Sequence, residues 1–250
     1  MATSDTAGAR QPRQPAGARA RAGRPRTRRS DGAALTPERI VDQALRLTER
    51  EGAQALTMRR LGDELGVDPT AVYRHFRDKD DLVLACLDRV IGEAYEGIAA
   101  GGIERSDWRA VLRAVADASW ASCQAHPAIY AQGFYRTTGG PGEQRMVELL
   151  LSSLATTGLS RAQTVVLYRA FVDSVLGLCG MEAASRSLEP AIAQKDATAW
   201  TRIYAVLPEA EYPAAREHAA ELSAVTDRDV FDNATQAVIS LIESRIDGAG

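Results

Sequence analysis

From Thr36 onward the sequence shows helical periodicity in one segment after another, and no segment sustains the alternation of a strand. Apolar residues recur three and four positions apart, and capping residues or prolines mark where the segments begin. This pattern predicts an all-α fold. At 45% hydrophobic and 25% charged residues, the 250-residue chain carries enough apolar material for a sizeable core.

Helix-boundary signals are dense over the first part of this region. Residues that cap helices at Thr36, Thr57 and Asp68, two of them followed by proline, predict three helix starts. Gly52 and Gly66 predict the ends of the first two helices. A long fourth helix is expected to start near residue 79.

The rest of the chain predicts further helices of uneven length. Two glycines at 101–102 mark a break, and Ser106 is the expected cap of the next helix. A short helix should run over 127–136, a loop over 137–142 and a helix over 143–156. Capping-box patterns predict a long helix over 160–185 and a final helix from 226, with short helical pieces punctuated by prolines between them.

Charge is unevenly distributed along the chain. Residues 1–30 hold eight Arg and one acidic residue, whereas the remainder carries a net charge of −10. The region 1–34, rich in Ala, Gly, Pro and Arg, is expected to be a disordered basic arm that meets an anionic partner. A transit peptide and a solvated tail without function are the alternatives. We therefore expect three parts, with the arm followed by a three-helix domain at 35–82 and a larger helical domain at 83–250.

Several protein classes find no support in the sequence. The apolar runs look too short to span a bilayer and no secretory signal is visible, so we expect a cytoplasmic protein without a membrane partner. The three cysteines are widely spaced, which predicts neither a metal site nor a disulfide framework. No nucleophile elbow, phosphate-binding loop or zinc-protease motif is present, so we expect no enzyme activity and no cofactor.

A short helix, a turn at Gly66 and a second short helix are typical of a helix-turn-helix, whose second helix enters the DNA major groove. Gly66 supplies the left-handed residue that ends the first helix, and Val67 closes the small core between the helices. A purely structural helical hairpin is the alternative. In the DNA-binding interpretation, the groove-facing residues are Asp68, Pro69, Thr70, Ala71, Tyr73, Arg74 and His75.

The run 56–82, LTMRRLGDELGVDPTAVYRHFRDKDDL, resembles the signature of the TetR family. The resemblance implies an operator-binding dimer with a ligand pocket in its C-terminal domain. It places Thr57, Tyr73, His75 and Lys79 at phosphate-contacting positions and Met58 and Arg59 at positions that touch phosphate or a base edge. Thr70, Ala71 and Arg74 are the expected sequence readers, since Arg pairs with guanine and methyl groups suit thymine.

The predicted DNA-binding unit is itself negatively charged, with eight basic and eleven acidic side chains in residues 31–82. Phosphate neutralisation must then come from a few placed residues and from the basic arm. The run 23–29 resembles an arm that lies in the minor groove, where narrow A·T tracts attract arginine. Its candidate DNA contacts are Arg24, Arg26, Arg28 and Arg29.

The C-terminal region resembles the tetracycline-repressor type, although Tyr95 falls where a metal-organising histidine would be expected. The helix over 160–185 is apolar around much of its circumference and must be buried, either in a dimer or within one subunit. The expected dimer interface is a four-helix bundle, to which each subunit contributes this helix and its final helix. Its candidate residues are Val172, Val175, Leu176, Gly177, Gly180, Val238, Leu241 and Ile242.

Amphipathic aromatic residues cluster on the helices predicted to pack together in this region, and a few of them suit an apolar ligand cavity. The candidates are Trp108, His126, Tyr130, Phe134, Tyr168 and Phe171. The sequence thus predicts a homodimeric regulator, a repressor that binds a palindromic operator on double-stranded DNA and is released by a small-molecule effector. A helical scaffold without sequence-specific DNA binding is the alternative.

Overall fold

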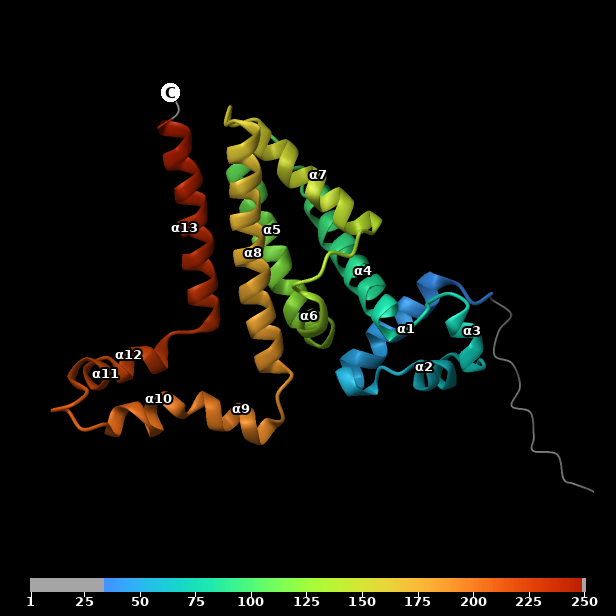
Figure 1. The fold of residues 1–250 in the computed structure, drawn as a ribbon, viewed down its shortest axis with the longest axis horizontal. Coiled ribbons are helices and arrows are strands. Elements are labelled where there is room, and N and C mark those ends of the chain that lie inside the picture. The colour runs from blue at the N-terminus through green and yellow to red at the C-terminus, as the bar shows by residue number, and fades with distance from the viewer. Residues whose placement is uncertain (1–33, 249–250) are drawn as a thin grey trace, which may run out of the picture. The chain divides into compact units, whose positions relative to one another are not determined.

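The computed structural model describes residues 34–248, and this part of the chain contains helices and no strand, as predicted. Its first four helices are α1 Pro37–Glu51, α2 Met58–Leu65, α3 Pro69–Tyr73 and α4 Lys79–Ala100, with a 3-10 turn, η1 Ala53–Ala55, after α1 (Figure 1). Side-chain oxygens of Thr36, Thr57, Asp68 and Asp78 accept hydrogen bonds from backbone N–H groups at the four helix starts. The first three of these caps confirm the boundaries that the sequence predicts.

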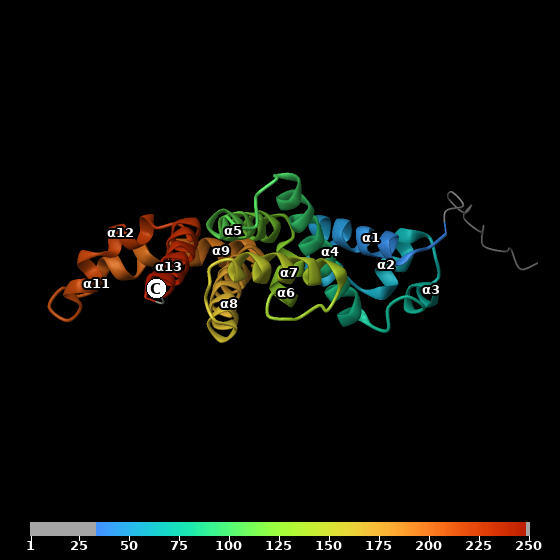
Figure 2. The ribbon, with the colours of Figure 1, turned by 90° about the horizontal axis from the view of Figure 1, so that it is seen from above.

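Five helices form the body that follows, namely α5 Trp108–Ala125, α6 Pro127–Gly133, α7 Pro141–Ala155, α8 Arg161–Arg186 and α13 Asp227–Asp247. Helix α8 is central, because α5, α6, α7 and α13 all contact it. Seen from above, α8 lies between α7 and α13 (Figure 2). The capping boxes predicted at Ser160 and Thr226 are both present.

One hydrophobic core runs through all of these helices. It extends from Ile40 on α1, through Leu87 on α4 and Leu112 on α5, to Ile242 on α13. The ring of Trp120 on α5 packs on Phe231 of α13 with 4.7 Å between centroids. Helix α4 passes without a break through the predicted domain boundary at residue 82, and it contacts α1 as well as α5, α6 and α7. The first helices and the body are therefore packed as one unit.

Several predicted boundaries are displaced by one to three residues. Helix α6 ends at Gly133, three residues before the predicted end at 136. Asp107, and not Ser106, caps α5, because its carboxylate accepts the N–H of Ala110. Helix α7 starts at Pro141, two residues earlier than predicted, since Pro141 fits the first helical position. The glycine-rich segment before it therefore belongs partly to the helix.

Helix α8 is long and apolar enough, by length and composition alone, to cross a membrane, with a mean hydropathy of 1.4 in its most apolar window. The expectation that no segment could span a bilayer was thus too strict. Four helices of the body pack on α8, and 33% of that window is buried within the described chain. Such a helix suits the core of a helical assembly, and much of its apolar surface still faces outward.

Short elements connect α8 to α13, as the prolines predict. They are α9 Pro190–Ala197, α10 Ala199–Arg202, η2 Tyr204–Val206, α11 Pro213–Glu217 and α12 Ala219–Ala224. These elements pack mainly on one another, and in Figure 1 they lie beneath α13, to one side of α8. Several large apolar side chains of this segment are exposed, including Ile192 and Val206.

Candidate nucleic-acid interface and internal cavity

The turn between α2 and α3 is held by backbone geometry. Gly66 adopts the left-handed conformation at φ 68°, as predicted. The N–H of Val67 donates to the carbonyl of Gly62 and the N–H of Gly66 to that of Asp63, which together form a Schellman motif. A Cβ atom on Gly62 would lie 3.1 Å from the Val67 carbonyl oxygen and 3.2 Å from the Pro69 nitrogen. Sequence reasoning missed Gly62, whose lack of a side chain lets α3 approach α2.

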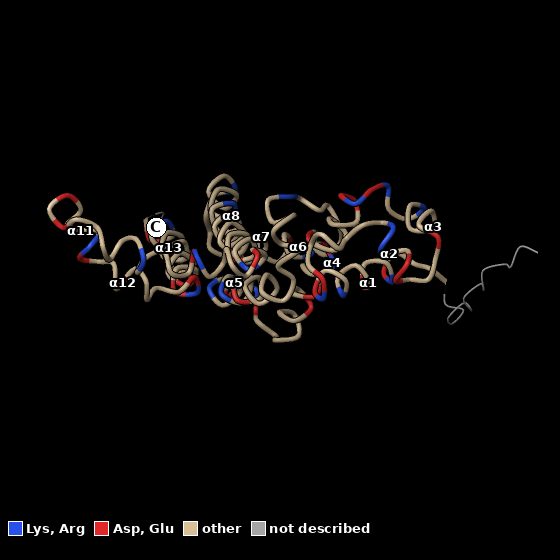
Figure 3. The backbone as a smooth tube through the Cα atoms, turned by 90° about the horizontal axis from the view of Figure 1, so that it is seen from below, with Lys and Arg blue, Asp and Glu red and all other residues tan. Residues whose placement is uncertain are grey.

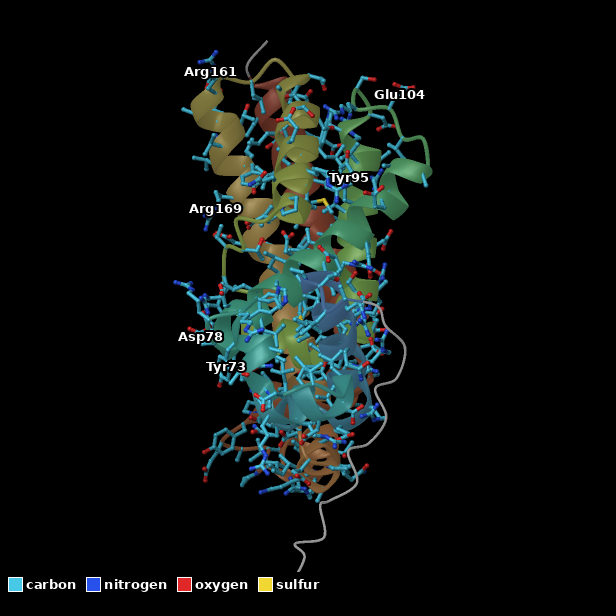
Figure 4. The ribbon with its side chains drawn as sticks, turned by 90° about the vertical axis from the view of Figure 1, so that its right-hand side faces the viewer. Tyr73, Asp78, Tyr95, Glu104, Arg161 and Arg169 are labelled. Carbon is cyan, nitrogen blue, oxygen red and sulfur yellow. The ribbon has the colours of Figure 1, made fainter. Side chains whose placement is uncertain are left out.

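The outer surface of α3 carries the polar side chains predicted to meet DNA. Thr70, Tyr73, Arg74 and His75 are exposed, with 52% of Tyr73 accessible. Figure 4 shows Tyr73 and Asp78 on the same side of the molecule. The Thr70 hydroxyl and N–H donate to Oδ1 of Asp68 at 2.7 and 2.9 Å, and these hydrogen bonds hold the pKa of the Asp68 carboxyl below its usual range. Asp68 therefore orders the start of α3, while the predicted Pro69 and Ala71 are half-buried.

Two predicted DNA contacts, Met58 and Lys79, are the first residues of α2 and α4. The side chain of Met58 is 6% exposed and belongs to the core, so the prediction of a side-chain contact there is wrong. It faces inward because the position after the Thr57 cap lies on the inner face of α2, next to Leu61. Lys79 starts α4 as predicted, and its ammonium donates to the carbonyl of Ala53 at 3.4 Å.

Ion pairs neutralise much of the acidic charge around this surface. Arg50 and Arg60 both contact Glu51 and Glu64 at 2.8–3.0 Å, which ties α1 to α2. Figure 3 shows basic and acidic residues interspersed along this end of the described chain.

Two predicted DNA-facing arginines stand outside this network. Among the described residues, no carboxylate lies within ion-pair distance of Arg59 or Arg74, and both side chains are exposed. Thr57, also exposed, caps α2 by accepting the N–H of Arg60 at 3.1 Å. The predicted contacts Arg24, Arg26, Arg28 and Arg29 lie outside the described residues.

An internal cavity of about 80 Å³ lies between α4, α5, α6, α7 and α8. Three of the predicted ligand residues, Tyr130, Tyr168 and Phe171, line it. Burial raises the pKa of both phenols, that of Tyr130 most strongly because this residue is 2% exposed. Sequence reasoning missed the contribution of α7, where Glu143, Met146 and other residues form one wall. Apolar periodicity identifies the inward face of α7 but not the wall against which it packs.

The other three predicted ligand residues lie outside this cavity, and their role in ligand binding stays a prediction. Trp108 is buried at the start of α5, with the Arg109 guanidinium 4.4 Å from its ring centroid. Phe134 packs against Gly180, where a Cβ would lie 2.4 Å from the ring. His126 borders a separate open groove of about 530 Å³ between α4 and α5. Aromatic character alone did not separate the cavity wall from the remaining core.

The predicted dimer residues divide between two faces. The prediction is wrong for Val175, Gly180 and Ile242, which are buried within the subunit. Val172 and Leu176 line the cavity. Because α8 is apolar almost all round, periodicity did not reveal which face turns inward.

The outward face of α8 and α13 carries other apolar residues. Gly177 and Val238 are half-buried, and Leu241 of α13 is 41% exposed. Leu241 shares a surface groove with Val166, an α8 residue that is 67% exposed and that sequence reasoning missed. This face is available for contact with another helix pair.

Polar contacts connect the cavity wall to the first helices. The Asp88 carboxylate on α4 accepts the N–H groups of Gly142 and Glu143 at 3.1 and 2.9 Å, so α4 caps the start of α7. Near the start of α4, Asp80 forms a two-pronged ion pair with Arg136 at 2.8 and 3.0 Å.

A further contact reaches α1. His126 Nδ1 lies 3.0 Å from Oε1 of Glu49, without the geometry of a hydrogen bond. Each of these contacts links the body to a helix that supports α3. Within residues 34–248, no group of three or more His, Cys, Asp and Glu side chains is arranged to hold a metal ion.

A short exposed helix behind a tight glycine turn, carried on a helical body with an internal cavity, defines a helix-turn-helix regulator. Comparison with known families makes this specific. Residues 40–86 match the family of bacterial regulatory proteins of the tetR type, and residues 102–246 match the tetracyclin repressor-like C-terminal domain. The chain therefore belongs to the TetR family of bacterial transcriptional regulators, as the signature at 56–82 predicts.

Curated relatives carry matching descriptions. The chain is 30% identical over 161 residues to an HTH-type transcriptional regulator of Saccharopolyspora erythraea, covering 63% of this chain and 65% of the relative. It is 29% identical over 168 residues to the HTH-type transcriptional repressor DrrR1 of Streptomyces coeruleorubidus, covering 66% and 60%. The match thus spans less than two thirds of the length of these relatives.

Solved structures share the fold over most of the chain. The TetR regulator SCO7222 of Streptomyces coelicolor matches with a TM-score of 0.66 and 28% identity, covering 84% of this chain and 99% of that one. Apo ActR of the same organism matches with a TM-score of 0.73 and 21% identity, covering 88% and 100%. SCO7222 and the curated relatives are described as transcriptional regulators or repressors.

Proposed function

We propose that this protein is an effector-responsive repressor that binds a palindromic operator as a homodimer. The observation that carries the proposal is the exposed surface of α3, where Arg74 projects beside Thr70 and Tyr73 without a carboxylate partner among the described residues. An arginine in this position suits bidentate pairing with guanine, and Tyr73 and His75 suit phosphate contacts. A regulator of bacterial promoters acts on DNA in the cytoplasm, so we propose a cytoplasmic location.

The DNA-binding proposal is tested by selecting a binding site from random duplexes with the full chain and measuring affinity by fluorescence anisotropy. Arg74→Ala should weaken binding to the selected site by about tenfold or more and relax the base preference at one position of each half-site. Arg105→Ala is the matched control, since Arg105 is also exposed and adjoins Glu104, far from Tyr73 in Figure 4. Failure to enrich any sequence would favour the alternative of a helical scaffold.

The basic arm is proposed to add affinity through the minor groove. Its sequence supports this, because eight arginines precede a DNA-binding unit that is net negative. Deleting residues 1–30 should lower operator affinity and flatten its dependence on salt, by about 0.9 in log–log slope for each phosphate that the arm neutralises. An unchanged slope would contradict the role of the arm.

Dimerisation is proposed through the outward face of α8 and α13. Support comes from Val166 and Leu241, which are exposed apolar neighbours at a groove between these helices. Pairing with a second copy would form a four-helix bundle and place two α3 helices about 34–36 Å apart on one face of DNA. Leu241→Glu should yield a monomer by light scattering. Tyr135→Glu changes an exposed residue beside Arg136, which pairs with Asp80 of α4, and should leave the dimer intact.

Release from DNA is proposed to begin at the cavity. Helix α4 supplies cavity residues Ile91 and Ala94, and its first turn carries Asp80, which pairs with Arg136. A ligand that separates α4 from α7 would shift α4 and so change the spacing of the two α3 helices. Such a ligand binds the dimer with shifted α4 more tightly than the DNA-binding dimer, and so favours release. Repression follows if the bound dimer occupies promoter DNA.

A further inference from the structure

The polar groups that line the cavity have a strong bias in charge. Within the described part of the chain, Glu143 is the only charged residue in the lining, and no Lys, Arg or His side chain faces the cavity. Hydroxyl groups come from Ser119, Tyr130 and Tyr168, and all other lining residues are apolar. A ligand in this space would therefore meet aromatic and aliphatic surface and a single negative charge.

The Glu143 carboxylate is only partly satisfied. Its Oε2 accepts the Gly139 N–H at 2.7 Å and the Thr138 hydroxyl at 3.2 Å. Among the described residues, Oε1 receives no hydrogen bond and neither oxygen forms an ion pair. The negative charge of Glu143 acts on the cavity wall. Burial raises the pKa of the Tyr168 phenol most, and the charge of Glu143 raises it further.

The surroundings of Glu143 add negative charge and no available positive charge. The Thr138 hydroxyl also lies 2.9 Å from Oδ1 of Asp88, so two half-buried carboxylates approach the same hydroxyl. Arg136 and Arg145, the arginines nearest to Glu143 in sequence, are paired with Asp80 and Glu96. Arg89, which follows Asp88, pairs with Asp42 and Glu93. Arg169, next to Tyr168, pairs with Asp173. A carboxylate beside an apolar cavity is costly unless a cation accompanies it.

We propose that the cavity binds an apolar organic cation, with its positive centre at Oε1 of Glu143 and its hydrocarbon body among the residues of α5 and α8. This inference rests on the proposed function, in which the same cavity receives the effector. The faces of Tyr168 and Phe171 would attract the cation further through their ring electrons. An anion of equal size would meet Glu143 without a compensating positive group, and a neutral molecule would desolvate that carboxylate without replacing its lost hydration.

The cavity must open to admit such a molecule. Its volume of about 80 Å³ is well below the roughly 300–1,000 Å³ of typical ligand pockets. Met146 of α7 and Ile91 of α4 are half-buried wall residues, and the unbranched Met146 side chain adapts readily to a new shape. Entry of the cation would therefore press α7 away from α4, which is the movement required for release from DNA.

A pair of ions of nearly equal size and opposite charge tests the proposal. Tetraphenylphosphonium and tetraphenylborate are each titrated by calorimetry into the full-length protein and into the Glu143→Gln variant. The glutamine side chain in this variant keeps an oxygen that can accept the Gly139 and Thr138 hydrogen bonds, so the start of α7 stays intact. We expect wild type to bind the phosphonium and not the borate, and Glu143→Gln to lose about tenfold of phosphonium affinity and most of the preference.

Glu148→Gln is the matched control, because Glu148 lies on the same helix, outside the cavity lining, with a side chain that is 70% exposed. Binding of neither ion, equal binding of both, or an equal effect of the two Gln variants would each overturn the proposal. Operator affinity is measured in the same samples. Intact operator binding without cation binding leaves the regulator function standing, whereas cation binding without any operator binding refutes DNA recognition and not the cavity assignment.

Discussion

Helices α4 and α7 cross at a pair of glycines, and adding one methyl group there should force them apart. A Cβ on Gly142 would lie 2.2 Å from the carbonyl oxygen of Asp88, and 2.9 and 3.1 Å from the nitrogen and Cα of Gly92. All three atoms belong to the backbone of α4, so no side-chain rotation can relieve the overlap. The two helices would have to separate by about 1 Å before the contact with Asp88 becomes an ordinary one.

The cost of Gly142→Ala follows from two opposing effects. Overpacking a well-packed contact costs about 1–3 kcal/mol, and here the clash is with rigid backbone. Alanine regains up to about 1 kcal/mol over glycine within a helix. We therefore expect a net loss of about 2 kcal/mol in the free energy of unfolding, or about 4–8 °C in Tm for a domain of this size. Because α4 is displaced, operator affinity should also fall with no effector present.

Urea unfolding at one fixed protein concentration, together with operator titration, measures both effects. Gly97→Ala is the matched control, since Gly97 lies in α4 and a Cβ there meets no atom within 4 Å. That variant should be more stable than wild type by up to about 1 kcal/mol. If Gly142→Ala were as stable as Gly97→Ala and bound the operator normally, the close crossing of α4 and α7 would be disproved.

Three further predictions concern single side chains. Thr57→Ala should lower the free energy of unfolding by about 1 kcal/mol in urea, because the cap on the Arg60 N–H is removed, and Thr57→Ser should restore most of it. The Arg136 guanidinium holds the pKa of the Asp80 carboxyl below its usual range, so this pair stabilises the fold above the usual aspartate pKa and is lost as pH falls through the lowered value. In Arg136→Gln, NMR titration should show the Asp80 pKa rising, and an unchanged pKa would contradict the pairing. Burial raises the pKa of the Cys86 thiol to about 12, so this cysteine and the two other buried ones should resist a thiol reagent at pH 8 until the protein unfolds.

Local signals predicted the DNA-binding helices closely because each boundary depends on one or two residues. Thr36, Thr57 and Asp68 cap helices through their own side chains, and Gly66 ends α2 through its own backbone conformation. Such interactions span three or four residues, so the sequence displays them directly. The same holds for the capping box at Ser160.

Features that depend on residues distant in sequence were beyond such reasoning. The packing role of Gly142 is set by Asp88 and Gly92, about fifty residues earlier, and in the sequence the glycine indicates only a loop. Met58 follows a helix cap, a position that fits either a phosphate contact or the core, and only packing decides between them. Helix α8 is apolar on nearly every face, so its periodicity could not assign Val175 to the interior and Val166 to the surface.

The small volume of the cavity affects the effector concentration at which a controlled gene would respond. If walls that pack closely in the free protein open in only about one molecule in a hundred, the apparent affinity is about a hundredfold weaker than that of the open form. Traces of a compound would then leave transcription unchanged, and only its accumulation would start a response. The concentration at which the response begins would be set by how tightly Met146 and its neighbours close the empty cavity, as much as by the contacts that the compound makes.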